Sequence, residues 1–262
     1  MTAATAILAV LSGSLVGLSL GLIGGGGSIL AVPLMAYVVG LPPHAAIGTS
    51  AVAVGASALA NLAGHARART VKWPCAVVFA VAGVAGAAIG AQIGKRVDGH
   101  ALLAAFGVLM IVVAALMVRP RRAGHDAHVH LTRASAARLL PPLAATGFAV
   151  GGLSGFFGIG GGFLVVPGLI SATAMPLLNA IGSSLVSVSA FGATTAVSYA
   201  ASGFVEWRIA GLFVLGGLAG GFAGIEAAKA LAGRKRVLAI VFSAVVALIG
   251  LYVTARGLVR YL

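Results

Sequence analysis

Residues 21–33 read GLIGGGGSILAVP, and residues 155–167 read GFFGIGGGFLVVP. Glycines, a leucine, a valine and a proline occupy matching positions, so one motif occurs twice. Each glycine in a helix costs about 1 kcal/mol relative to alanine, so a run of glycines inside an apolar segment predicts a break in the helix. A break at membrane depth is tolerated only where it is buried in protein or lines an aqueous cavity. The helix that restarts, at Ser28 or Phe163, should direct free N–H groups into that cavity and attract an anion.

Composition places the chain in a membrane. It has 262 residues, of which 60% are hydrophobic and 8% charged, and its mean hydropathy is +1.12. Soluble domains carry about 25% charged residues. Since about 20 helical residues cross a bilayer, we expect an all-α integral membrane protein with about eight to ten membrane segments. The first apolar run, from Thr2 to Leu22, lacks a basic region before it, so we interpret it as a span; a cleaved signal is the alternative.

The second half of the chain repeats the first at an offset of 134 residues, which is the separation of Pro33 and Pro167. The match has no gap from about residue 13 to residue 118. Matched pairs include Gly17/Gly151, Pro42/Pro176, Ser50/Ser184, Val71/Val205, Trp73/Trp207, Gly83/Gly217 and Lys95/Lys229. Internal repeats of this kind are typical of transporters. We therefore divide the chain into a first transmembrane repeat (1–118), a polar basic linker (119–138) and a second transmembrane repeat (139–262).

Each repeat contains five apolar segments that we expect to be helical. In the first repeat they cover Ala3–Ile23, Ser28–Val39, His44–Gly64, Trp73–Gly94 and Ala101–Val118. The second segment is too short to cross a bilayer alone. We interpret it as a half helix or as a re-entrant partner of the segment before it.

Charged loops predict the orientation of the repeats. In the first repeat the loop after the third segment is basic (residues 67–72), whereas in the second repeat the next loop is basic (residues 229–236). Because basic loops face the cytoplasm, the repeats should be inverted copies with an odd number of crossings each. The linker then lies inside and both termini lie outside. Arg256 and Arg260 weigh against this orientation.

Further motifs are doubled after the glycine-rich stretches. Residues 42–50 read PPHAAIGTS, residues 176–184 read PLLNAIGSS, and Val-x-Trp follows at 71–73 and 205–207. Together with the glycine breaks, these motifs resemble the TauE/SafE family, also called sulfite exporters or toluene sulfonate uptake permeases. The resemblance covers almost the entire chain. It implies a bacterial inner-membrane carrier of sulfite, organosulfonates or related small sulfur oxyanions and carboxylates, usually moving them outward, and it does not identify the substrate.

Substrate-binding candidates are the glycine breaks and the polar residues of the third segments. Hydroxyl and amide groups can hydrogen-bond sulfonate oxygens without a charge that would trap the anion. The alternative role is structural, because small residues let membrane helices pack closely and serine often bonds its own i−4 carbonyl. The candidates are Gly24, Gly25, Gly26, Gly27, Ser28, Thr49, Ser50, Asn61, Gly158, Gly160, Gly161, Gly162, Ser183, Ser184 and Ser187.

Three titratable residues are candidates for proton coupling. His44 and His65 lie at segment ends, and Glu226 is the carboxylate closest to a span. As alternatives, interfacial histidines are common, and Lys229 one turn after Glu226 can neutralise it as a structural pair.

No cofactor or metal is expected. The linker carries His125, His128 and His130, which are metal-binding residue types, but they lie in a short loop without a second cluster. Cys75 is the single cysteine, so internal disulfides are excluded, and we interpret it as inert packing.

We expect a transporter and not an enzyme, because the sequence lacks His-Glu-x-x-His, Gly-x-Ser-x-Gly and paired carboxylates within spans. The hypothesis is a secondary carrier that works by alternating access; a passive anion channel, a carrier of small carboxylates and a scaffold protein are the alternatives. Expected partners are a small anion, the lipid bilayer and a second copy of the chain as a homodimer. The net charge of +13 lies largely in short loops between spans and reflects membrane orientation, so no nucleic acid is expected.

Overall fold

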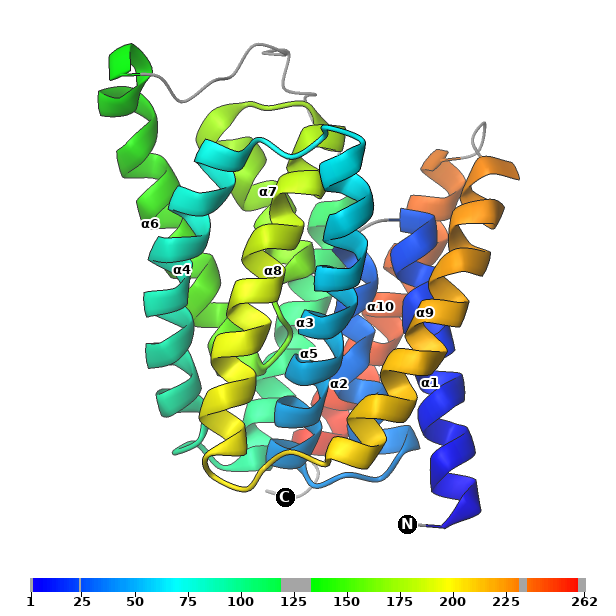
Figure 1. Ribbon diagram of the computed structural model, residues 1–262. Helices are drawn as coiled ribbons and strands as arrows, with labels where there is room; N and C mark the ends of the chain where they lie inside the picture. The colour runs from blue at the N-terminus through cyan, green and yellow to red at the C-terminus, as the bar shows by residue number, and fades with distance from the viewer. Residues whose placement is uncertain (1, 24, 119–132, 231–234, 259–262) are drawn as a thin grey trace.

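The computed structural model describes residues 2–23, 25–118, 133–230 and 235–258, which contain helices and no strand (Figure 1). The first repeat contains α1 (Ala3–Ile23), η1 (Gly25–Leu30), α2 (Ala31–Pro33), η2 (Leu34–Val38), α3 (Pro43–Arg67), α4 (Trp73–Gly94) and α5 (Gly99–Val118). The second repeat contains α6 (Arg133–Phe157), α7 (Gly162–Thr173), α8 (Leu177–Ala200), α9 (Trp207–Ala230) and α10 (Lys235–Leu258). α6 begins inside the segment 119–138 that we predicted as a linker, six residues before the predicted boundary at residue 139. The prediction of an all-α protein is confirmed.

Eight of the described helices are long and apolar enough to cross a membrane, four in each repeat. Two shorter apolar helices, Gly27–Val38 and Gly162–Thr173, form the second segment of each repeat. Large apolar side chains such as Val81, Leu215 and Phe222 are exposed on the outside of the bundle, where lipid would cover them. The chain is a multi-pass membrane protein.

Prolines set the starts of the central helices. Pro42 and Pro176 have the extended backbone that precedes a helix, with ψ of 149° and 146°. Pro43 then occupies the first helical position of α3, where its missing N–H costs nothing. The third segment of each repeat therefore begins at the same point in the repeated sequence.

Helices of one repeat pack on helices of the other through glycines. Gly13 of α1 lies against the backbone of Phe213 in α9, and the equivalent Gly147 of α6 lies against Phe79 in α4. A Cβ atom at either glycine would overlap that backbone, so only glycine allows these helices to approach so closely. The two repeats are thus interleaved.

The central helices α3 and α8 pack antiparallel. Gly48 near the start of α3 lies beside Phe204, just after α8 ends, and Gly55 lies beside Gly192. Gly182 near the start of α8 lies beside Thr70, just after α3 ends. Figure 1 shows the same relation, since α3 begins at the lower end of the view and α8 at the upper end.

Candidate functional site

The second glycine-rich stretch forms a buried turn between two helices. α6 ends at Phe157 and α7 begins at Gly162. Between them Gly158, Gly160 and Gly161 have φ values of 66°, 63° and 75°. This left-handed backbone is accessible to glycine without strain. The helix break that the sequence predicts is present here.

Packing also requires glycine in this turn. A Cβ atom on Gly158 would overlap the side chain of Ile47, and one on Gly160 would lie 2.7 Å from Val54 Cγ1. Both neighbours belong to α3. The turn therefore lies directly against the central helix of the other repeat.

The first glycine-rich stretch folds differently from the second. Gly24 lies outside the described residues. For Gly25 and Gly26 the structure describes the backbone alone. η1 is a 3-10 helix from Gly25 to Leu30, and the chain then forms one α-helical segment at Ala31–Pro33 and a π-helix at Leu34–Val38. The restart is therefore a 3-10 helix from Gly25, three residues before the predicted Ser28. Consecutive glycines and a proline without an N–H weaken the α-helical pattern in this segment.

A cavity of about 30 Å³ lies where the two repeats meet. That volume holds about two water molecules. Its walls come from α1, η1, α3, α7 and α8, and they comprise Leu20, Ser28, Val54, Ala58, Asn61, Gly162, Ser184, Leu185 and Val188. No charged residue lines it within the described part of the chain.

The cavity is lined by equivalent residues of the two repeats. Val54 and Val188 are 134 residues apart, and so are Ser28 and Gly162. Both valines are buried, with 3% of their surface exposed. The cavity thus lies at the junction of the repeats.

The start of α7 provides a helix N-terminus at the cavity wall. Gly162 lines the cavity, and no side-chain hydrogen bond caps the helix at Gly161 among the described residues. The Ser154 hydroxyl lies beside Gly161, is fully buried and has no hydrogen-bond partner in the described part. Backbone N–H groups and the helix dipole at such an end favour an anion.

Four of the predicted binding residues line the cavity: Ser28, Asn61, Gly162 and Ser184. Asn61 Nδ2 donates to Ser57 O at 2.9 Å, and the Ser184 hydroxyl donates to Ile181 O at 2.7 Å. The Oδ1 atom of Asn61 and the lone pairs of Ser184 can meet a ligand or water.

Other predicted hydroxyls hold the protein together. The Ser50 hydroxyl lies 2.9 Å from Ile47 O and 3.2 Å from Gly158 O, so it can donate to its own helix or to the glycine turn. Thr49 Oγ1 accepts a hydrogen bond from the backbone N–H of Glu206 at 3.0 Å. Ser183 Oγ accepts one from the backbone N–H of Lys72 at 2.9 Å.

Ser187 is fully buried, and its hydroxyl has no partner among the described residues. It does not line the cavity, although Ser184 and Val188 on the same helix do.

The proton-coupling candidates lie away from the cavity lining. The His44 ring stacks on Phe204 with centroids 5.3 Å apart, and its Nε2 is buried without a hydrogen-bond partner in the described part. His65 Nδ1 lies 2.9 Å from Thr70 Oγ1. Glu226 is exposed, and the side chain of its predicted partner Lys229 lies outside the described residues.

The linker histidines His125, His128 and His130 also lie outside the described residues. Within the described ranges, no three His, Cys, Asp or Glu side chains are grouped as a metal site would require. Cys75 is buried.

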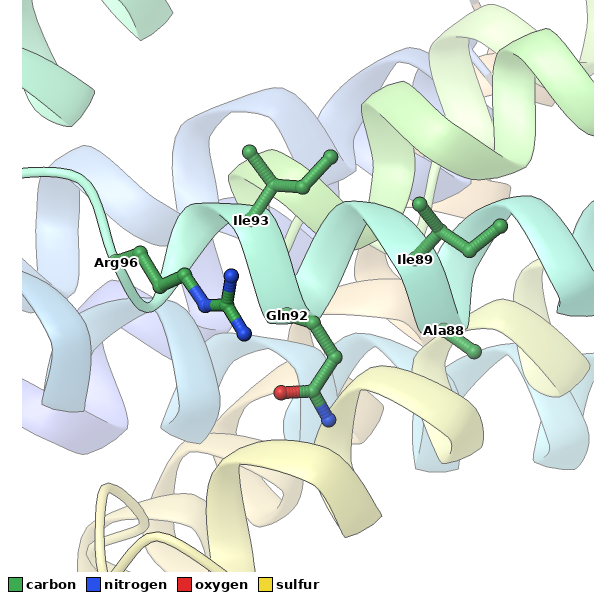
Figure 2. Close-up of a pocket in the computed structure, with 5 residues that line it drawn as sticks. All are labelled: Ala88, Ile89, Gln92, Ile93 and Arg96. Carbon is green, nitrogen blue, oxygen red and sulfur yellow. The ribbon is translucent and has the colours of Figure 1, made fainter.

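A second depression, of about 330 Å³, lies on the outer face of α4. Figure 2 shows its five lining residues, Ala88, Ile89, Gln92, Ile93 and Arg96. Four of them belong to α4 and Arg96 follows two residues after its end, and none was predicted to bind substrate. It is therefore a surface feature, separate from the cavity between the repeats.

Sequence reasoning missed the apolar wall of the cavity and Ser154. Leu20, Val54 and Val188 are ordinary residues for a membrane helix, so their composition carries no signal. For Val54 and Val188 the repeat was the one available signal, because the two valines occupy equivalent positions.

Comparison with known proteins identifies relatives along the full chain. The family model described as sulfite exporter TauE/SafE matches residues 9–253. A probable membrane transporter protein of Xylella fastidiosa (strain 9a5c) is 49% identical over 98% of both chains. The probable membrane transporter protein YunE of Bacillus subtilis (strain 168) is 27% identical over 96% of this chain and 98% of its own. No solved structure matches the chain significantly.

Proposed function

The chain belongs to the TauE/SafE sulfite exporter family of membrane transporters, and on that premise we propose that it is a secondary carrier of small sulfur oxyanions. Sulfite and small organosulfonates are the substrates that we favour, and export is the favoured direction. The carrier resides in the bacterial inner membrane and works by alternating access.

The observation that carries this proposal is the cavity between the repeats. Both repeats contribute to it at equivalent positions, with Val54 facing the same space as Val188. Carriers built from internal repeats hold their substrate at the repeat interface, near the middle of the membrane.

The chemistry of the cavity suits a monoanion. The N-terminus of α7 supplies N–H groups and a partial positive charge, while Ser28, Asn61 and Ser184 supply polar atoms. A buried arginine would need a counter-ion whenever the carrier is empty, and a helix end does not. The loaded and the empty carrier can therefore both reorient.

The packing of the repeats supports alternating access. α3 and α8 are equivalent helices, and they pack antiparallel across the centre of the molecule. The hydrogen bonds Glu206 N–H to Thr49 Oγ1 and Lys72 N–H to Ser183 Oγ are equivalent contacts, and each joins one repeat to the other. We propose that the repeats are inverted copies, so that rocking one against the other exposes the cavity to each side in turn.

A passive anion channel is the second candidate function, since helix ends can also line a pore. The small cavity favours the carrier, because a continuous water-filled path would occupy far more space than about two water molecules. A carrier of small carboxylates would use the same polar groups.

The test is uptake into proteoliposomes of radiolabelled sulfite, taurine and acetate, each with and without an imposed pH gradient. Saturable sulfite flux with counter-transport is the expected result. Single-channel currents would instead establish a pore, and saturable acetate flux without sulfite flux would establish a carboxylate carrier.

A further inference from the structure

Two equivalent helix interfaces have different packing in this structure. α4 packs on α8, and the equivalent helix of the second repeat, α9, packs on α3. At the first interface the ring of Phe191 fills the space beside Gly83. At the second, the equivalent Gly217 faces the small side chain of Ser57, with Ser57 Oγ 3.6 Å from the position of a Cβ atom.

The exposure of equivalent residues follows the same asymmetry. Asn61 lines the cavity and is exposed, whereas Thr195 at the equivalent position is fully buried. The Thr195 hydroxyl has no hydrogen-bond partner in the described part of the chain. Gly64, one turn after Asn61, has open space around it. The cavity therefore reaches the surface along α3 and is shut along α8.

One described cation also bridges the two helices of the shut interface. Lys95, which follows α4 directly, donates from Nζ to Ser198 O and to Ser202 Oγ, both at 3.1 Å. Ser198 belongs to the last turn of α8, at the negative end of the helix dipole, and its carbonyl oxygen also accepts a hydrogen bond from the Ser202 hydroxyl at 3.3 Å. A charged donor strengthens such bonds. The equivalent of Lys95 is Lys229, whose side chain lies outside the described residues.

We propose that Lys95 is the lock of a closed gate formed by α4 and α8, an inference that rests on the proposed alternating-access function. When Lys95 leaves the end of α8, this interface opens and α9 closes over α3, so Thr195 becomes accessible and Asn61 is covered. α3 and α9 end at the upper end of Figure 1, where α6 begins. With the linker in the cytoplasm, as the charged loops predict, the structure is the inward-open state.

Cysteine accessibility tests the gate directly. Because Cys75 is the single cysteine, Cys75→Ala provides a background without thiols. Asn61→Cys and Thr195→Cys then report on equivalent positions at the two gates. With a membrane-impermeant maleimide in oriented vesicles, Asn61→Cys should react from the linker side, and Thr195→Cys should be protected from both sides.

Adding Lys95→Ala should raise the labelling rate of Thr195→Cys about tenfold and lower that of Asn61→Cys by a similar factor. Lys95→Ala removes two hydrogen bonds from a charged donor, and tenfold is the low end of what the loss of even one such bond produces. The reciprocal change is the essential readout. If Lys95 only caps α8, Lys95→Ala would raise the labelling rate of Thr195→Cys without lowering that of Asn61→Cys. That one-sided result, or no change at either reporter, would overturn the proposal.

Matched variants separate the lock from general effects. Arg96→Ala removes the neighbouring cation, whose side chain lies just beyond the end of α4 (Figure 2), and should change neither rate. Lys95→Arg keeps a donor within reach and should restore the parent pattern. Ser202→Ala removes one exposed acceptor of Lys95 and should change both labelling rates in the same directions by a smaller factor. This variant keeps the proposal testable if Lys95→Ala does not insert into the membrane.

The labelling assay needs no substrate. Absence of sulfite flux with reciprocal labelling would therefore withdraw the substrate class and leave the gate standing. Simultaneous reaction of both cysteines from opposite sides in the parent would contradict alternating access and the lock together.

Discussion

Thr49 Oγ1 accepts a hydrogen bond from the backbone N–H of Glu206 at 3.0 Å, and the same bond recurs 134 residues later between Ser183 Oγ and the N–H of Lys72 at 2.9 Å. Thr49 and Ser183 are both fully buried. α3 and α9 begin at the lower end of Figure 1, and α4 and α8 begin at the upper end. The two bonds therefore join the repeats near opposite faces of the molecule.

Removing either acceptor should destabilise the folded protein by similar amounts. Thr49→Val and Ser183→Ala each leave a backbone N–H unpaired, at a cost of about 1 kcal/mol or more. Thermal unfolding of the purified protein in detergent measures this. Thr194→Val and Ser189→Ala are the controls, because those hydroxyls donate to carbonyls of their own helix and should matter less. If all four variants lose the same thermal stability, the hydrogen bonds between the repeats contribute no more than those within a helix.

Gly161→Ala should reduce sulfite flux at least tenfold. The residue has φ of 75° and directly precedes α7, so a Cβ atom there strains the backbone by about 1–2 kcal/mol and meets Ser154 Oγ at 3.0 Å. Gly203→Ala is the matched control, since φ is also 75° but the space around it is open. If both variants lose flux equally, backbone strain alone explains the effect and the anion site loses this support.

Asn61→Asp should raise the KM for sulfite at least tenfold. The substitution keeps the side-chain shape and places a negative charge in the cavity wall. Two like charges about 5 Å apart repel by about 3 kcal/mol at an effective dielectric constant of 20. Concentration-dependent uptake in proteoliposomes measures the change. Asn61→Thr, which installs the residue found at equivalent position 195, is the uncharged control and should retain most of the flux.

Val188→Ala should admit longer substrates. Val188 and Val54 both line the cavity, and each added methylene that finds apolar space is worth about fourfold in affinity. Inhibition of sulfite uptake by alkanesulfonates of increasing chain length measures this, with the strongest inhibitor expected to be about one carbon longer in the variant. Val197→Ala on the exposed face of α8 is the control. If the order of inhibitor strength in Val188→Ala is unchanged, Val188 does not limit the chain length of the substrate.

Much of the architecture could be predicted from residue patterns. The apolar segment at Trp73–Gly94 coincides with α4, and the segment at Ala3–Ile23 coincides with α1. The break after Phe157 is also where the glycines predict it. These features depend on local propensity and on the length of apolar runs, which are written directly in the chain.

The roles of neighbouring hydroxyls could not be predicted in this way. Ser183 holds the N–H of Lys72, whereas Ser184 beside it lines the cavity. Successive residues on a helix point about 100° apart, so two adjacent serines face different neighbours. Only the packing of the helices decides which neighbour each of them meets.

The sequence by itself determined a membrane protein of two repeats, each broken at a glycine-rich stretch, because hydropathy, glycine content and the 134-residue offset are properties of the chain alone. Only the tertiary structure decided that equivalent residues such as Asn61 and Thr195 differ in exposure. The reason is physical: two similar repeats can pack against each other in unequal ways, and that choice depends on contacts between residues more than 100 positions apart, such as Lys95 and Ser198.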